Sequence, residues 1–300
     1  MTSYAILDDR EILAISGPDA RSFLQAIISN DASKITPAVS IYAALLTPQG
    51  KFLHDFIISQ HEDLFLLDTE KRRVSDLVKR LNIFRLGSNV TIGTKPEELL
   101  VAALWNKNGL PISRGNPKLG DTEKMSSCSV ILDPRLAALG YRIIGTPSDI
   151  KAFWSNKLSA TPTKSDYDIH RLEMGVPDGS RDIQVNKSFL LESNFEELNG
   201  VAFDKGCYIG QENTARQKHR GTIRRRLIKV YISGPPPNED EIITWENGEI
   251  GQIRSVKNTC GMAIVRLDRW AEAKAQNAEF HAGLATVVPV IPEWMAYKNT

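Results

Sequence analysis

The chain has 300 residues, of which 42% are hydrophobic and 24% are charged, an ordinary composition for a globular protein. Its formal net charge of +1 excludes a global electrostatic field that would attract nucleic acid or a membrane surface, so charged ligands must be bound locally. Single hydrophobic cores rarely grow to this length, and we therefore expect two or three domains.

The first residues and the cysteines indicate a cytoplasmic protein. The start lacks the basic and apolar regions of a secretory signal and the arginine-rich composition of a transit peptide. No apolar run is long enough to span a membrane, so no membrane partner is expected. Cys128, Cys207 and Cys260 are odd in number and widely spaced, which fits neither a disulfide framework nor a CxxC metal site. We therefore expect reduced thiols and no resident metal.

Hydrophobic periodicity predicts two α+β domains followed by a small β-barrel, with the first boundary at residues 94–98. In residues 1–95 the predicted order is a strand at 11–16, a helix opening at 17–19, a hairpin of strands 41–46 and 52–58, a strand at 64–68 and a helix at 70–84. In residues 96–222 it is strands at 99–105, 130–132 and 141–145, loops over 106–127, and helices at 148–158 and 165–174. In residues 223–300, short strands at 226–232, 249–256, 261–266 and 285–291 indicate the barrel.

The octapeptide Lys-Gly-Cys-Tyr-Ile-Gly-Gln-Glu at residues 205–212 is the most informative motif. Its two glycines let the backbone turn or approach a ligand closely, and a helix is predicted to begin near Glu212. The N–H groups and dipole of that helix, together with the ammonium of Lys205, would stabilise a thiolate at Cys207. A lone cysteine is more often a small buried apolar residue. The polar flanks favour a reactive thiol, while its chemistry stays open.

The segment after the octapeptide is strongly basic. Residues 213–238 contain no carboxylate, and their cationic residues are Arg216, Lys218, Arg220, Arg224, Arg225, Arg226 and Lys229. Runs of this kind usually form a solvated face of a protein. Arginine also binds carboxylate and phosphate groups bidentately, so a small polyanionic ligand is an alternative. RNA is less favoured, because no stacking motif accompanies the run.

Two further pairs of polar residues are candidates for a ligand site. Arg171 and Glu173 end a predicted helix, where they form either a surface ion pair or part of a cavity wall. His54 and Asp55 follow the turn at residues 47–51 on one predicted strand, so their side chains point to opposite faces. The periodicity alone does not choose between these alternatives.

The order of these motifs resembles that of the YgfZ-type folate-binding proteins, bacterial relatives of the mitochondrial iron–sulfur assembly factors in the glycine-cleavage T-protein superfamily. The resemblance rests on the octapeptide at 205–212, the basic residues that follow it up to 227, Arg-x-Glu-x-Gly-x-Pro at 171–177 and Leu-Thr-Pro-Gln-Gly-Lys at 46–51. It touches most of the chain and is densest over residues 171–227. Eight matching residues with correctly ordered flanks are far more specific than a lone glycine-rich pattern.

The resemblance implies an aminomethyltransferase-like α+β fold, in which two α+β sheet domains and a C-terminal β-barrel surround a central folate-binding cavity. It implies tetrahydrofolate or a folate derivative as the cofactor. The expected binding residues are Glu173 at the pterin ring, Arg216, Arg220 and Arg225 at the glutamyl tail by electrostatic complementarity, and Arg171, Lys205, Tyr208 and Gln211 in the same motifs.

The resemblance also implies a role in assembling or repairing iron–sulfur enzymes, including enzymes that modify tRNA. Such enzymes or assembly proteins would be the partners, and Cys207 would be a redox, sulfur-handling or transiently ligating thiol. The alternative is a folate-dependent aminomethyl or one-carbon transferase that uses Asp55. His54 stands where the aminomethyltransferase carries a further acidic residue, which disfavours that alternative. We therefore expect no conventional turnover enzyme, and direct nucleic-acid binding is the least favoured function.

Overall fold

The computed structural model describes residues 2–94, 99–106, 116–154, 163–221, 223–246 and 248–295. The chain forms two compact units, each built from segments that are separated in sequence. Unit 1 consists of Met1–Gln49, Leu53–Tyr167 and Leu198–Gln211, and unit 2 of Gly50–Phe52, Asp168–Glu197 and Glu212–Thr300. The boundary predicted at residue 95 falls outside the described residues, and the domain ranges 1–95, 96–222 and 223–300 stay predictions.

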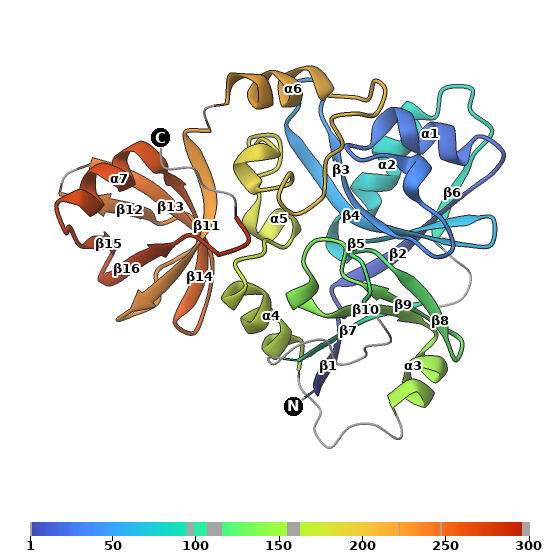
Figure 1. Ribbon diagram of the computed structural model, residues 1–300, viewed down its shortest axis with the longest axis horizontal. Coiled ribbons are helices and arrows are strands. Elements are labelled where there is room, and N and C mark those ends of the chain that lie inside the picture. Colours follow the sequence, from blue (N-terminus) through green and yellow to red (C-terminus); the bar gives the residue numbers. More distant parts are fainter. Residues whose placement is uncertain are drawn as a thin grey trace. The chain divides into compact units, whose positions relative to one another are not determined.

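The first sheet of unit 1 has five strands in the order β3-β4-β5-β2-β6 (Figure 1). Its strands are β2 (Arg10–Ser16), β3 (Ile41–Leu46), β4 (Phe52–His61), β5 (Leu64–Glu70) and β6 (Thr91–Thr94), and its helices are α1 (Ala20–Ile27) and α2 (Val74–Phe84). The predicted β-α-β-β-β-α order is confirmed, with β6 as an additional edge strand. The amphipathic spacing of α1 buries Phe23, Leu24 and Ile27, which is why this short segment is helical.

The second sheet of unit 1 has the order β1-β7-β10-β9-β8. Its elements are β1 (Thr2–Ile6), β7 (Leu100–Asn106), β8 (Thr122–Met125), β9 (Cys128–Leu132), β10 (Tyr141–Gly145) and α3 (Pro147–Trp154). The prediction of loops over 106–127 is wrong at β8. This strand lies at the sheet edge, where β9 is its neighbour among the described strands, and three of its four residues are polar, so it carries little of the apolar signal that identifies strands. The helix predicted at 148–158 is described only as far as Trp154.

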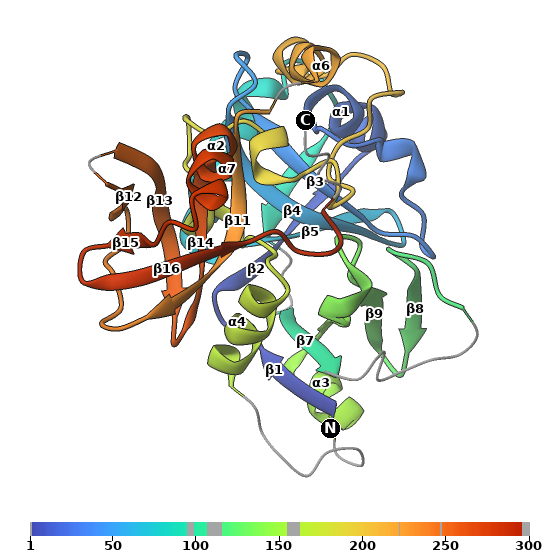
Figure 2. The same cartoon turned by 60° about the vertical axis from the view of Figure 1, so that its left-hand side comes forward.

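Unit 2 contains a closed barrel with the strand order β11-β14-β13-β12-β15-β16, which confirms the predicted barrel (Figure 2). Its elements are β11 (Arg225–Ser233), β12 (Ile242–Trp245), β13 (Gly248–Lys257), β14 (Cys260–Arg266), α7 (Leu267–Ala275), β15 (Phe280–Ala282) and β16 (Ala285–Val290). Alternate residues such as Ile228 and Val230 enter the apolar core, so the residues between them belong to the outer face.

Three helices lie in the part of the chain that carries the motifs. α4 (Lys164–Glu173) ends at the Arg-x-Glu segment, α5 (Gly179–Asp182) follows it, and α6 (Gln211–Arg220) begins within the octapeptide. Short 3-10 helices occupy Ala32–Lys34, Lys71–Arg73, Ala137–Leu139 and Leu191–Ser193. Within the described ranges, no helix is both long and apolar enough to cross a membrane.

Candidate functional site

The octapeptide forms a loop that presents Cys207 to solvent. Cys207 is exposed, whereas Cys128 and Cys260 are buried in strands β9 and β14. Burial raises the pKa of the Cys128 thiol to about 11, and burial also raises that of Cys260. Cys207 is therefore the accessible thiol among the three cysteines of the chain.

Lys205 holds the start of this loop against helix α1. Its ammonium donates hydrogen bonds of 2.8, 2.7 and 2.8 Å to the backbone carbonyls of Gln25, Ile28 and Asn30. These carbonyls lie at the C-terminal end of α1 and just beyond it, where the helix dipole favours a cation. Burial lowers the pKa of Lys205 to about 8, and the carboxylate of Asp31 opposes that shift. The octapeptide motif by itself does not indicate this role for the lysine.

The residues after Cys207 are also held in place by contacts with Lys205 and with helix α1. Tyr208 is buried, and its ring centroid lies 4.9 Å from the Lys205 ammonium. The Ile209 N–H donates to the Ala26 carbonyl over 3.2 Å, and Gly210 turns the chain into α6 with a φ of 82°. The thiol is thus displayed between two fixed points, which is the arrangement that a preorganised reactive group requires.

Glu173 lies at the C-terminal end of α4 and is partly exposed. The Lys229 ammonium donates to the Glu173 carbonyl over 3.0 Å, and the Trp294 indole donates to the Met174 carbonyl over 2.7 Å. Gly175 then adopts a φ of 70°. This helix end is fixed through its backbone, and the Glu173 carboxylate is a group of the kind that accepts hydrogen bonds from a polar ligand.

Arg171, from the same motif, is committed to the interior of unit 2. Its guanidinium donates to the Asp182 carboxylate over 2.6 Å and to Asp168 over 3.3 Å, and its side chain is only 3% exposed. Arg181 forms a second contact with Asp168, 2.7 Å long. A ligand could reach Arg171 only by breaking a buried ion pair, so we leave it out of the site proposed below.

His54 and Asp55 point to opposite sides of β4, as predicted. Asp55 accepts a hydrogen bond of 2.8 Å from the Tyr42 hydroxyl on β3, and burial together with this carboxylate raises the pKa of Tyr42. The His54 Nε2 lies 2.9 Å from the Asp76 carboxylate on α2. Burial lowers the pKa of His54 to about 4, so the ring is neutral at pH 7.

The basic residues predicted to form one cluster are divided among different roles. Arg216 and Arg220 are exposed on α6, where Arg216 pairs with Glu212 one turn earlier. Arg226 is buried and donates to the Leu191 carbonyl and to Glu197. Arg225 is exposed and reaches Glu192 over 3.3 Å. Only part of the run is therefore available to a ligand.

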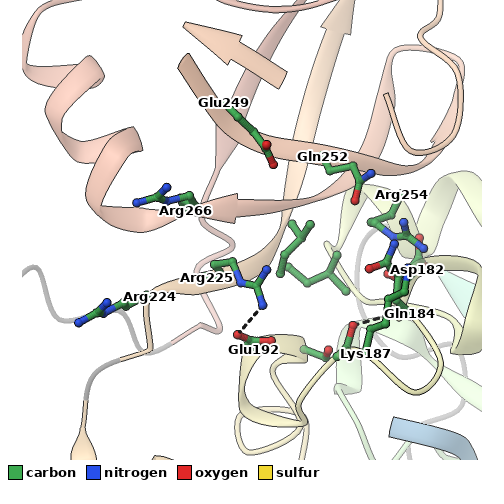
Figure 3. A pocket seen from close by; sticks show the side chains of 14 residues that line it. Asp182, Gln184, Lys187, Glu192, Arg224, Arg225, Glu249, Gln252, Arg254 and Arg266 are labelled. Atoms are coloured by element: carbon green, nitrogen blue, oxygen red, sulfur yellow. Dashed lines mark hydrogen bonds and ion pairs between the residues drawn. The ribbon is translucent and has the colours of Figure 1, made fainter. Parts of the chain in front are cut away.

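A cavity of about 610 Å³ lies within unit 2, between the outer face of the barrel and residues 182–193 (Figure 3). Its lining residues are Asp182, Gln184, Lys187, Ser188, Glu192, Ser193, Arg224, Arg225, Leu227, Glu249, Gln252, Arg254, Ile264 and Arg266. Figure 3 shows Arg225 reaching toward Glu192, with Gln252 and Arg254 across the cavity. Arg224 and Arg225 stand out in the sequence as part of the basic run, whereas the lining residues of β13 and β14 carry no sequence signal of a ligand site.

The described residues contain no group of three or more His, Cys, Asp or Glu side chains arranged to hold a metal ion. A metal–sulfur group at Cys207 would therefore need ligands from another molecule, because a cluster site requires several protein or thiol ligands.

Comparison with known proteins places this chain in a family. Residues 224–297 match the family model for the CAF17 C-terminal β-barrel domain. The human mitochondrial iron–sulfur cluster assembly factor IBA57 is 31% identical over 310 residues, which cover 96% of this chain and 84% of the human protein. The chain belongs to the IBA57 family of iron–sulfur cluster assembly factors. Mouse IBA57 is 30% identical over 308 residues, with the same two coverages of 96% and 84%.

The fold has a counterpart in a solved structure. The glycine cleavage system aminomethyltransferase T from Bartonella henselae matches with a TM-score of 0.75 and 16% identity, covering 98% of this chain and 86% of the other. The predicted aminomethyltransferase-like α+β fold is thereby confirmed.

The prediction of a cytoplasmic protein is wrong. The IBA57 relatives from human and mouse are named as mitochondrial proteins. The prediction depended on general features of the first residues and on unpaired cysteines, and reduced thiols are equally compatible with an organelle interior.

Proposed function

We propose that this protein supports iron–sulfur cluster assembly through the thiol of Cys207, which handles sulfur or transiently ligates the cluster that is its cargo. The observation that carries the proposal is the exposure of Cys207 on a loop whose neighbours, Lys205 and Tyr208, are buried and held against α1. A single thiolate cannot complete a cluster site, so a partner protein or a small thiol supplies the other ligands. The recipients include iron–sulfur enzymes that modify tRNA.

A Cys207→Ser variant tests this proposal in cells that lack the protein. A serine hydroxyl is a poor substitute for a thiolate toward iron, so we expect the cluster-dependent tRNA modification to stay at the level of the deletion strain. The measurement is the modified nucleoside content of tRNA by mass spectrometry. Cys260→Ala is the matched control, because that thiol is buried and should act only as a small apolar group. Full rescue by Cys207→Ser would remove this thiol from the mechanism.

We also propose that the protein binds tetrahydrofolate or a related folate, with Glu173 accepting hydrogen bonds from the pterin ring. Support comes from the partly exposed carboxylate at the fixed end of α4. The exposed Arg216, Arg220 and Arg225 suit the anionic tail, whereas Arg171 and Lys205 have their donors engaged inside the protein. The donor set of the chain therefore fits this ligand in part.

Calorimetry with tetrahydrofolate checks the folate proposal. Glu173→Gln should weaken binding about tenfold, because it replaces a charged acceptor by a neutral amide, which costs roughly 1.4 kcal/mol. Glu272→Gln on α7 is the control, since this exposed carboxylate pairs with Arg269. Failure of the wild-type protein to bind, or undiminished binding by Glu173→Gln, would refute the assignment without affecting the proposal for Cys207.

A further inference from the structure

The outer face of the barrel carries like charges on neighbouring strands. Arg225 on β11 is paired directly with Arg266 on β14, and both residues belong to the lining of the cavity. Figure 3 shows Arg225 directed toward Glu192 and the Arg266 side chain directed away from it. Like charges at directly opposed positions of an antiparallel pair destabilise a sheet. Arg225 pairs with Glu192 over 3.3 Å, and Arg266 pairs with Asp268 over 3.1 Å. Both arginine side chains are about half exposed. Such ion pairs are weak, so this wall keeps the capacity to bind another anion.

Three more cations line the same cavity, and one of them, Arg254, pairs with Asp240. For the side chains of Lys187 and Arg224, the described residues provide no hydrogen bond or ion pair. Of the three carboxylates in the lining, Asp182 is already compensated by Arg171, Glu192 is shared with Arg225, and Glu249 is the third. The local balance therefore favours a negatively charged ligand, although the whole chain is almost neutral.

Lys51, the last residue of the motif at 46–51, contacts residues of the cavity region. Its ammonium donates to the Lys187 carbonyl over 2.8 Å and lies 3.1 Å from the centroid of the Phe189 ring. Burial lowers its pKa, while Glu192 raises and Arg225 lowers it, so the lysine lies within the electrostatic reach of both cavity residues. The Thr-Pro-Gln-Gly-Lys turn and the basic run thus meet around Glu192.

The floor of the cavity is apolar. Leu227 and Ile264 are opposed on β11 and β14, two residue pairs along from the two arginines and on the same face of the sheet. The amides of Gln184 and Gln252 add donors and acceptors around this floor. A volume of about 610 Å³ suits a small organic molecule, and a few polar groups around apolar surface are typical of such sites.

We propose that this cavity binds a small organic anion with at least two carboxylate or phosphate groups attached to a compact apolar body. Arg224, Arg225 and Lys187 pair with the anionic groups, and the body lies over Leu227 and Ile264. Glu192 competes with the ligand for Arg225. The site goes beyond the cluster-assembly proposal and needs neither Cys207 nor Glu173, while Arg225 is shared with the folate proposal.

Isothermal titration calorimetry on the full chain tests the site with adenosine diphosphate, citrate and inorganic tripolyphosphate. We expect adenosine diphosphate or citrate to bind with a Kd below about 1 mM, and the preferred probe separates phosphate from carboxylate recognition. Arg225→Gln and Arg224→Gln should each weaken binding about tenfold. Glu192→Gln should strengthen binding about threefold, because it removes the competing carboxylate.

Arg72→Gln is the matched control, since it removes the same charge from an exposed arginine of the 3-10 helix Lys71–Arg73 that does not line the cavity. It should leave binding unchanged. The proposal is overturned if neither organic probe binds the wild-type chain below about 1 mM. It is also overturned if tripolyphosphate alone binds, or if Arg72→Gln weakens binding as much as Arg225→Gln, because the attraction would then be nonspecific. Thermal unfolding of each variant verifies that it is folded.

Discussion

Lys205 shows how a residue in a functional motif can serve the structure of its neighbour. The ammonium has three N–H donors, and the carbonyls of Gln25, Ile28 and Asn30 accept one bond each. The last carbonyls of a helix have no partner within the helix, so the lysine completes the end of α1. The position of Cys207 therefore depends on a contact with residues about 180 positions earlier.

His54 makes the stability of the protein sensitive to acid. The folded pKa of about 4 lies below the ordinary value of 6.5, so the unfolded chain takes up a proton at a higher pH than the folded protein does. Stability should therefore be complete above pH 6.5 and should fall as the pH decreases toward 4, by on the order of 3 kcal/mol at most. Urea unfolding at about pH 7.0, 5.5 and 4.5 measures this change in the free energy of unfolding.

The comparison for this prediction is His54→Gln, which removes the titrating group. Its unfolding free energy should change less between pH 6.5 and 4 than that of the wild type. His61 lies on the same strand, and its side chain is partly exposed. His61→Gln should keep the wild-type pH dependence of the free energy of unfolding. An unchanged pH profile in His54→Gln would show that other groups cause the loss in acid.

At the scale of elements, Gly175 allows the end of α4 to pack against the C-terminal segment. Its φ of 70° is unfavourable for residues with a side chain, and an added Cβ would meet the Pro292 Cγ at 2.6 Å and the Lys229 Cβ at 3.4 Å. The glycine thus ends the helix and also leaves space for its neighbour. This explains why the Arg-x-Glu-x-Gly segment forms a fixed corner beside Glu173.

Gly175→Ala should lower the free energy of unfolding by about 1–3 kcal/mol, because both the backbone and the packing are strained. Gly206→Ala is the control from the octapeptide, since nothing lies within 4 Å of its added Cβ and its φ is not in the left-handed region. It should change stability by less than about 0.5 kcal/mol. Equal effects of the two substitutions in chemical denaturation would contradict this account of Gly175.

At the scale of the whole molecule, each compact unit is assembled from separated segments. In unit 2 the α4–α5 region and the barrel share one charge network, because Asp182 receives both Arg171 and the Ser255 hydroxyl of β13. Arg254 of β13 also donates to the Asp182 carbonyl over 3.1 Å. Breaking this network should therefore loosen the barrel as well as the helices.

Arg171→Met should destabilise unit 2 by about 3–5 kcal/mol, because it leaves the buried Asp182 carboxylate without its cation. Hydrogen exchange measured by mass spectrometry should show faster exchange in α4, α5 and β13, with less change in β7 and β10 of unit 1. Arg216→Met removes an exposed arginine and should leave the exchange pattern unchanged. Exchange confined to α4 would show that the network does not support the barrel.

The local sequence pattern was sufficient to predict those helices and strands whose apolar and polar residues alternate within a few positions. The hairpin around residues 47–51, the amphipathic α1 and four of the six barrel strands follow from the periodic pattern of apolar and polar side chains, whereas the short barrel strands β12 and β15 were not predicted. β1 and β8 were also not predicted from the sequence. β1 pairs with β7, about a hundred residues later in the chain, and β8 is a short polar edge strand. Strand pairing at that separation leaves little trace in a single sequence.

The sequence by itself determined the motif order, the exposed-thiol hypothesis and the type of fold, because these depend on residue identity and spacing. Only the tertiary structure decided which charges are structural and which are available. Arg171 and Arg226 are buried on carboxylates and Lys205 on backbone carbonyls, whereas Arg225 faces a cavity. A cation looks the same in sequence in all these places, since its role is set by partners that folding brings from distant segments.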